Sequence, residues 1–105
     1  MTEAEDLAKD YRVAFLHFLS SREEAALHRG YELGRGAFAD GVSVLDLARM
    51  HHDVLLAVLR DTPAEELTDA ATAASEFFLA VLSTFDLAQR AFLDRLQADG
   101  TAPAR

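Results

Sequence analysis

The stretch Gly41–Leu59, GVSVLDLARMHHDVLLAVL, decides the fold class of this chain. Gly41 suits the position just after one helix, and Ser43 with Asp46 three residues later suits the capping arrangement that starts the next. Most residues beyond Ser43 are apolar, which is typical of a buried helix: Val44, Leu45, Leu47, Ala48, Met50, Val54, Leu55, Leu56, Val58 and Leu59. We therefore expect a helix here that forms the centre of the domain, with three other helices around it.

The composition of the 105-residue chain is that of a single globular domain, because half of the residues are hydrophobic and only two are prolines. There is no cysteine, which excludes disulfides and favours a cytoplasmic protein. The net charge of −8 disfavours nucleic acid and anionic membranes as partners. No apolar run approaches the roughly 20 residues that span a bilayer. The N-terminal residues MTEAEDLAKD are acidic and lack a hydrophobic stretch, so we do not expect them to be a signal peptide. We expect no membrane association.

Three more capping pairs of the form Ser/Thr-x-x-Asp/Glu mark helix starts, at Thr2 with Glu5, Ser21 with Glu24 and Thr62 with Glu65. They predict helices over residues 3–19, 22–39 and 63–98, in addition to the helix after Ser43, with Pro63 at a first helical position. Short connections favour antiparallel neighbours. The predicted fold is an all-α, antiparallel four-helix domain over residues 1–98 with a long C-terminal helix, followed by a flexible tail over residues 99–105.

Apolar stripes at helical spacing identify the buried faces of the first two helices. The first stripe consists of Leu7, Tyr11, Ala14, Phe15 and Phe18, and the second of Leu27, Tyr31, Gly34 and Phe38. Gly30 and Gly34 share one face of the second helix. Each glycine destabilises a helix interior by roughly 1 kcal/mol relative to alanine. Two explanations are open: close approach of a neighbouring helix, or a soft helix that bends on binding.

The last helix carries a heptad-like seam: Leu67, Ala71, Ala74, Phe78, Val81, Phe85, Ala88 and Phe92. About 35 residues at 1.5 Å each give a rod of roughly 50 Å, longer than the diameter of about 34 Å expected for a compact domain of this size. Either the helix breaks near residues 68–70, or its exposed seam meets a second copy of the chain. We expect a homodimer.

No constellation for catalysis or metal binding is apparent, so we expect a non-enzymatic protein without a cofactor. His51 lies on the apolar stripe of its helix, and His52 beside it points elsewhere, so we expect His51 to be hydrogen-bonded to a neighbour. A di-iron site would need the motif Glu-x-x-His on two helices. His28 follows Glu24 by four residues, one position too far for that motif. The acidic clusters stand in first helical turns, where they complement the helix dipole.

One functional surface is predicted from the aromatic residues of the last helix. An exposed part of Phe77, Phe78 and Phe85, with Leu27 and Tyr31 nearby, would form a groove for a partner. The alternative for most of these residues is simple burial in the core.

The run EEAALHRGYELGR (Glu23–Arg35), together with Gly41–Leu59 and the following Pro63, resembles the N-terminal domain of RsbU-type phosphoserine phosphatases. In that family a turn leads into a helix with acidic, then small or apolar residues, then a histidine followed by Val-Leu. These places are filled here by Asp46, Ala48, His51, Val54 and Leu55. The resemblance extends over about residues 7–92.

The resemblance implies an all-helical dimer, related in fold to the C-terminal domain of the clock protein KaiA, that recruits a switch kinase of the anti-sigma-factor family. It also implies a partner surface from the second to the fourth helix, at His28, Ala74 and Phe78. The family often has an aromatic residue in place of His28 and a larger aliphatic residue in place of Ala74. The sequence contains no phosphatase domain, so we expect a free-standing module or a fragment of a larger regulator.

The leading hypothesis is a protein-interaction domain in bacterial stress-response or sigma-factor regulation. Its partner-binding residues are predicted to be Leu27, His28, Tyr31, Ala74, Phe77 and Phe78. Two alternatives remain open: a sensor that holds a small ligand or a metal in the bundle, and a plain dimerisation module.

Overall fold

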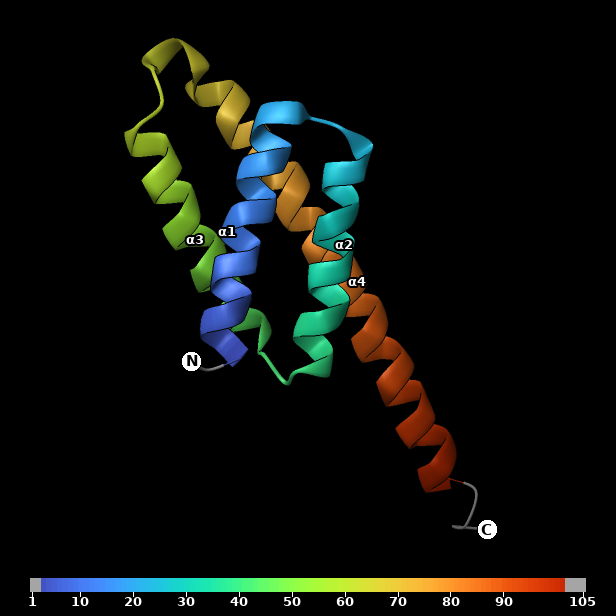
Figure 1. The fold of residues 1–105 in the computed structure, drawn as a ribbon. Coiled ribbons are helices and arrows are strands. Elements are labelled where there is room, and N and C mark those ends of the chain that lie inside the picture. The colour runs from blue at the N-terminus through green and yellow to red at the C-terminus, as the bar shows by residue number, and fades with distance from the viewer. Residues whose placement is uncertain (1–2, 102–105) are drawn as a thin grey trace.

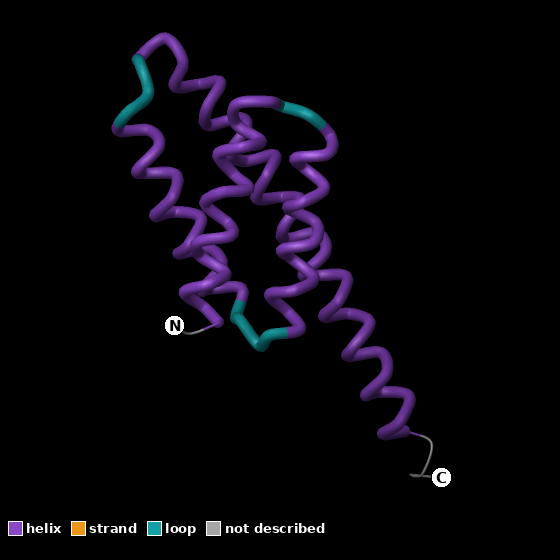
Figure 2. The backbone as a smooth tube through the Cα atoms, viewed as in Figure 1, coloured by secondary structure: helices purple, strands orange, loops and turns teal. Residues whose placement is uncertain are grey.

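Four helices and one 3₁₀ turn make up residues 3–101, the part of the chain that the computed structural model describes (Figures 1 and 2). Helix α1 spans Glu3–Ser21, α2 Glu24–Ala39, α3 Val44–Arg60 and α4 Leu67–Thr101, with the 3₁₀ turn at Ala64–Glu66. Consecutive helices run in opposite directions, and these residues include no strand. The predicted all-α, antiparallel four-helix fold is confirmed.

Helix α4, and not α3, is the centre of the domain, since α4 packs against all three other helices, most extensively against α2, and has more buried residues than any of them (Figure 1). Only Leu47 and Val54 of α3 are buried. Val44 and Leu45 of the same helix are 53% and 56% exposed. The prediction that α3 forms the centre is therefore wrong. Apolar composition indicates which residues favour burial, but α3 lies at the edge and has neighbours on one side only.

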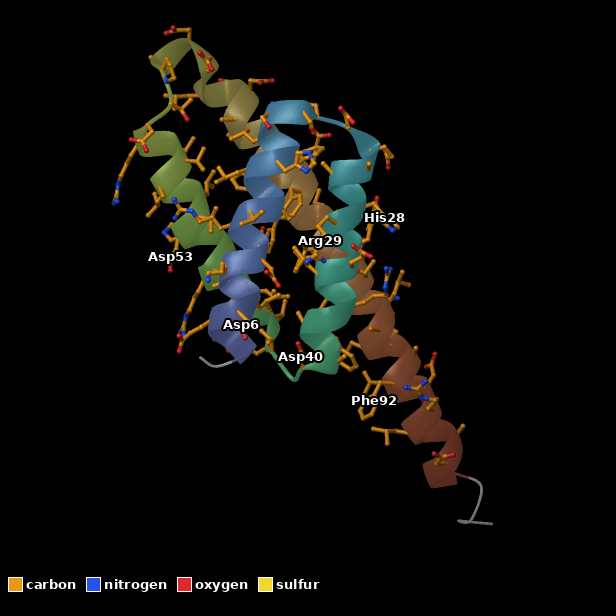
Figure 3. The ribbon with its side chains drawn as sticks, viewed as in Figure 1. Asp6, His28, Arg29, Asp40, Asp53 and Phe92 are labelled. Atoms are coloured by element: carbon orange, nitrogen blue, oxygen red, sulfur yellow. The ribbon has the colours of Figure 1, made fainter. Side chains whose placement is uncertain are left out.

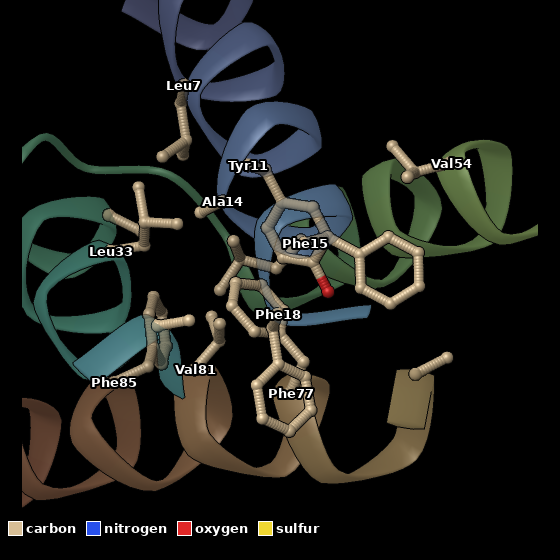
Figure 4. Packing of buried hydrophobic residues seen from close by; sticks show 14 of the residues in the cluster. Leu7, Tyr11, Ala14, Phe15, Phe18, Leu33, Val54, Phe77, Val81 and Phe85 are labelled. Carbon is tan, nitrogen blue, oxygen red and sulfur yellow. The ribbon is translucent and has the colours of Figure 1, made fainter. Parts of the chain in front are cut away.

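An aromatic cluster between α1 and α4 forms the core (Figure 4). Tyr11, Phe15 and Phe77 are all completely buried. The ring of Phe77 lies 5.2 Å from that of Tyr11 and 5.8 Å from that of Phe15, between centroids. Such edge and tilted contacts contribute about 0.5–1.5 kcal/mol each beyond their buried area. The stripe predicted for the first helix, from Leu7 to Phe18, is confirmed because all its members are buried.

Two glycines allow α2 to approach α4 very closely. A Cβ atom on Gly34 would overlap the carbonyl oxygen of Val81 and the hydroxyl of Thr84, and a Cβ on Gly30 would meet an aromatic ring edge at 3.2 Å. The Thr84 hydroxyl also donates a hydrogen bond to the carbonyl of Tyr31 at 2.6 Å. Close helix packing therefore explains both glycines.

The boundary between α2 and α3 follows the prediction. The Ser43 hydroxyl accepts a hydrogen bond from the backbone N–H of Asp46 at 3.0 Å. Gly41 adopts a φ of 78°, and the N–H of Val42 reaches back to the carbonyl of Ala37 at 3.0 Å. These bonds close a Schellman motif, in which a left-handed glycine satisfies the last carbonyls of the preceding helix.

The predicted start of the second helix is wrong. Ser21 belongs to the last turn of α1, and its hydroxyl accepts from the backbone N–H of Glu23 at 3.2 Å. Arg22 has a φ of 58°, a left-handed conformation that no helix can include. Helix α2 therefore begins at Glu24, and its N-cap Glu23 makes no side-chain cap. The predicted pair at Thr2 lies outside the described residues.

The predicted start of the fourth helix is also early. The Thr62 hydroxyl donates to the carbonyl of Val58 at 2.6 Å, in the last turn of α3, so it does not cap a new helix. Pro63 precedes the 3₁₀ turn, and α4 begins only at Leu67.

Helix α4 is unbroken at residues 68–70 and extends past the rest of the domain (Figure 1). The longest dimension of the structure is 62 Å, against 29 and 20 Å for the other two. The predicted overhang is confirmed. Residues 99–101, expected in the tail, are helical, and residues 102–105 lie outside the described part.

The buried face of α4 is rotated from the predicted seam. It consists of Ala70, Ala73, Ala74, Phe77, Ala80, Val81, Thr84 and Phe85. Leu67, Ala71 and Phe92 of the seam are exposed instead. Four alanines on the buried face allow three helices to approach one rod, which a heptad of large residues would prevent.

By length and composition alone, residues 64–99 could cross a membrane, contrary to the expectation that no apolar run is long enough. A core helix of a globular domain passes the same test. In this structure 44% of the apolar window of α4 is buried, and Phe77, Val81 and Phe85 of this helix belong to the core.

Candidate functional site

An apolar groove lies on the outer surface between α2 and α4, and we call it the α2–α4 groove. It has a volume of about 340 Å³ and is lined by Leu27, Tyr31, Glu76, Leu79, Ala80 and Ser83. Leu79 is 64% exposed, among the highest fractions for a large apolar side chain in the described residues. Glu76 is the single charged residue among the lining residues. The groove therefore suits the apolar side chains of another protein.

The close contact of α2 with α4 positions this groove. The hydrogen bond from Thr84 fixes the backbone of Tyr31, and the absence of side chains at Gly30 and Gly34 brings Leu27 and Tyr31 beside α4. Because both walls are rigid helices, the groove is preformed.

The structure separates the predicted partner-binding residues into three groups. Leu27 and Tyr31 line the groove, and His28, exposed beside it, presents its ring edge-on to Tyr31 with centroids 6.2 Å apart (Figure 3). Ala74 and Phe77 are only 1% and 0% exposed. The prediction placed these two residues on the surface, and this is incorrect. The buried face of α4 is rotated from the predicted seam, so both residues lie in the core.

Phe78 lies on the opposite flank of α4, in the seam with α3. Its ring stacks on that of His51, with centroids 4.1 Å apart and planes only 6° from parallel. The Nδ1 atom of His51 is also hydrogen-bonded to the hydroxyl of Tyr11, at 2.7 Å. The expectation that His51 is hydrogen-bonded to a neighbour is confirmed.

Burial tunes both partners of this hydrogen bond. Desolvation lowers the pKa of His51, and the nearby charge of His52 lowers it further. Desolvation also raises the pKa of the Tyr11 phenol well above its ordinary value of 10.0. A neutral imidazole and a neutral phenol can share a hydrogen bond, so the contact is consistent with both shifts.

Sequence reasoning missed four residues of the groove: Glu76, Leu79, Ala80 and Ser83. All four lie off the predicted heptad seam, and Leu79 is conspicuous only once its exposure is known. Among the described residues no group of three or more His, Cys, Asp or Glu side chains could hold a metal ion.

These features define the class of protein: a small all-helical domain with an apolar groove on its surface. The chain belongs to the family of the N-terminal domain of the phosphoserine phosphatase RsbU, whose family model matches residues 9–88. The resemblance found in the sequence is thereby confirmed. This family consists of regulatory, non-catalytic helical domains that act in stress-response signalling. No match was found among curated proteins or among solved structures.

Proposed function

We propose that the α2–α4 groove binds a regulatory protein of the switch-kinase, anti-sigma type, and that the domain acts in this way within bacterial stress-response and sigma-factor regulation. The single observation that carries the proposal is the uncovered apolar surface of Leu79 beside Leu27 and Tyr31. The family membership supports it, because residues 9–88 match a regulatory domain.

Binding would bury an apolar anchor of the partner between the two helices. A volume of about 340 Å³ is large enough for one or two large side chains, and such central, desolvated contacts provide most of the energy of an interface. His28 and Glu76 stand at the rim, where polar contacts contribute to specificity. The domain needs no cofactor for this role and performs no catalysis, and a cytoplasmic location fits a partner that controls transcription.

Calorimetric titration with switch-kinase homologues tests the proposal. We expect Leu79→Glu to weaken binding by about tenfold or more, because it places a charge in the apolar contact. Leu45→Glu is the matched control, since Leu45 is similarly exposed on α3 and lies outside the α2–α4 groove. If no homologue binds the unaltered domain, or if the two variants bind equally well, the proposal is wrong.

We also propose that the domain is a homodimer through the overhanging part of α4. Four large apolar residues there are 41–65% exposed: Leu87, Phe92, Leu93 and Leu96. The ring of Phe92 lies 5.8 Å from the ring of Phe38 in α2, between centroids. Sedimentation velocity checks the assembly state, and we expect Leu93→Glu with Leu96→Glu to yield a folded monomer. A monomeric unaltered domain at high concentration would refute the dimer.

A further inference from the structure

Helix α3 lies at the edge of the bundle (Figure 1) and is held less firmly than the other helices. Only Leu47 and Val54 of its 17 residues are buried, whereas α2 buries five of its 16. Within residues 3–101 no ion pair joins α3 to another element, since the pair between Arg49 and Asp46 lies inside the helix. Burial of apolar surface provides most of the energy that holds an element in place, so α3 should open at the lowest cost.

The side chain of His51 provides the polar attachment of α3. Its Nδ1 atom is hydrogen-bonded to the hydroxyl of Tyr11 in α1 at 2.7 Å, and its ring stacks on that of Phe78 in α4, with centroids 4.1 Å apart. The ring of Phe15 in α1 adds an edge contact, at 6.4 Å between centroids. In the described part of the chain, no other side-chain hydrogen bond joins α3 to another helix. His51 therefore joins α3 to both α1 and α4.

The C-terminal half of α3 borders an open cavity. This cavity lies between α1 and α3, has a volume of about 330 Å³, and is lined by Leu16 on the α1 side and by Val54, Ala57 and Val58 on the α3 side. Side chains at such a gap are not close-packed on that side and forgo part of their dispersion energy. This half of α3 therefore adds little to the attachment at His51.

We propose that α3 opens as a separate unit: it leaves α1 and α4 while the other three helices stay folded, and protonation of His51 favours the opening. Opening would uncover the ring of Phe78 and the side of the aromatic core that faces α3. The domain would then present this apolar surface only when α3 is released. Phe78 and Leu79 lie on different flanks of α4, so the proposal does not rest on the function proposed above.

The surroundings of His51 explain the effect of acid. The ring is faced by Tyr11 and Phe15 from α1, by Phe78 from α4 and, along its own helix, by His52. None of these side chains is negatively charged at neutral pH, so none stabilises an imidazolium. Burial therefore lowers the pKa of His51 in the closed form, and the charge of His52 lowers it further. In the open form this pKa returns toward 6.5, so the open form binds the proton more tightly and the opening constant rises as the pH falls.

Native-state hydrogen exchange of the unaltered chain, followed by NMR, tests the separate opening. At about pH 7.5 we expect the amides of residues 47–58 in α3 to be protected at least about tenfold less than those of residues 73–84 in α4. Low concentrations of urea should speed exchange strongly in α4 and only weakly in α3, because a local opening exposes less surface than global unfolding. Between about pH 7.5 and about pH 5.5 the protection of α3, corrected for intrinsic exchange rates, should fall by about 3–10-fold.

Two histidine variants test the role of His51. His51→Gln keeps a hydrogen-bonding partner for Tyr11 but does not titrate, so it should lose most of the acid effect on α3. His28→Gln is the matched control, since His28 is exposed on α2, and it should retain the effect. Titration of the His51 imidazole in the unaltered chain gives an independent measurement, and we expect a pKa below 6.5.

Three results would overturn the proposal. The first is equal protection of α3 and α4 with the same response to urea, which would make the domain one cooperative unit. The second is an acid effect of the same size in both histidine variants. The third, which needs no variant, is a pKa of 6.5 or above for His51 in the folded chain.

Discussion

Replacing Gly34 with alanine should destabilise the domain, although alanine is the better helix former. The new Cβ would overlap the carbonyl oxygen of Val81, which is backbone and cannot rotate away, and the hydroxyl of Thr84. Helix α2 must therefore move away from α4. This movement also breaks the 2.6 Å hydrogen bond from Thr84 to the carbonyl of Tyr31.

The expected magnitude follows from three contributions. Overpacking costs about 1–3 kcal/mol, and the lost hydrogen bond costs about 1 kcal/mol. The higher helix propensity of alanine returns about 1 kcal/mol. The net loss of unfolding free energy for Gly34→Ala is thus about 2 kcal/mol, which lowers the Tm of a domain of this size by roughly 10 °C.

Gly36→Ala is the matched control, two residues further along the same helix. Nothing lies within 4 Å of a Cβ at Gly36. This variant gains the helix propensity without the clash, so it should be up to about 1 kcal/mol more stable than the unaltered protein. The two variants should therefore differ by about 3 kcal/mol in urea unfolding followed by circular dichroism, at two protein concentrations to separate any effect of dimerisation. If Gly34→Ala is as stable as Gly36→Ala, the described approach of α2 to α4 is incorrect.

Two further predictions concern titration and backbone conformation. Burial lowers the pKa of His51 below 6.5, so the unfolded chain binds the proton more tightly, and unfolding free energy should fall as the pH drops below 6.5. His51→Gln keeps an acceptor for Tyr11 and should reduce this slope in urea titrations from about pH 8 to about pH 5.5; an unchanged slope contradicts the assignment. Arg22→Gly should leave the stability unchanged or raise it by up to about 1 kcal/mol in thermal unfolding. Glycine adopts the left-handed φ of 58° without strain, and this gain outweighs the lost exposed ion pair with Asp69. A clear loss of stability in this variant would contradict the prediction.

The sequence predicted much of the fold because its signals are local. The turn at Gly41 and Ser43 depends on φ preference and a short side-chain bond, both of which a few residues determine. The capping pairs at Ser21 and Thr62 predicted helix starts at the wrong residues. The hydroxyl that makes serine and threonine good caps also bonds to other backbone groups. A hydroxyl bonds to whichever backbone group is nearest. Here the Ser21 hydroxyl accepts from the N–H of Glu23 in the connection, and the Thr62 hydroxyl donates to the carbonyl of Val58 in the preceding helix.

The phase of α4 could not be predicted from hydropathy. Phe77 and Phe78 are adjacent and equally apolar, yet one is completely buried and the other stacks on His51 at a seam. Which of them enters the core depends on the small residues that let α1 and α2 approach. The heptad pattern gave weight to large residues and overlooked Ala73 and Ala80. Leu79 was missed because exposure is a property of the assembled bundle.

The overhang of α4 gives the domain a lever arm. About 17 residues from Phe85 to Thr101 extend roughly 25 Å at 1.5 Å per residue. A tilt of about 10° in the half that the other helices hold would displace the free end by roughly 4 Å. A small rearrangement at either face of the bundle would thus be amplified mechanically, and whatever is attached to the tip would receive it as a displacement.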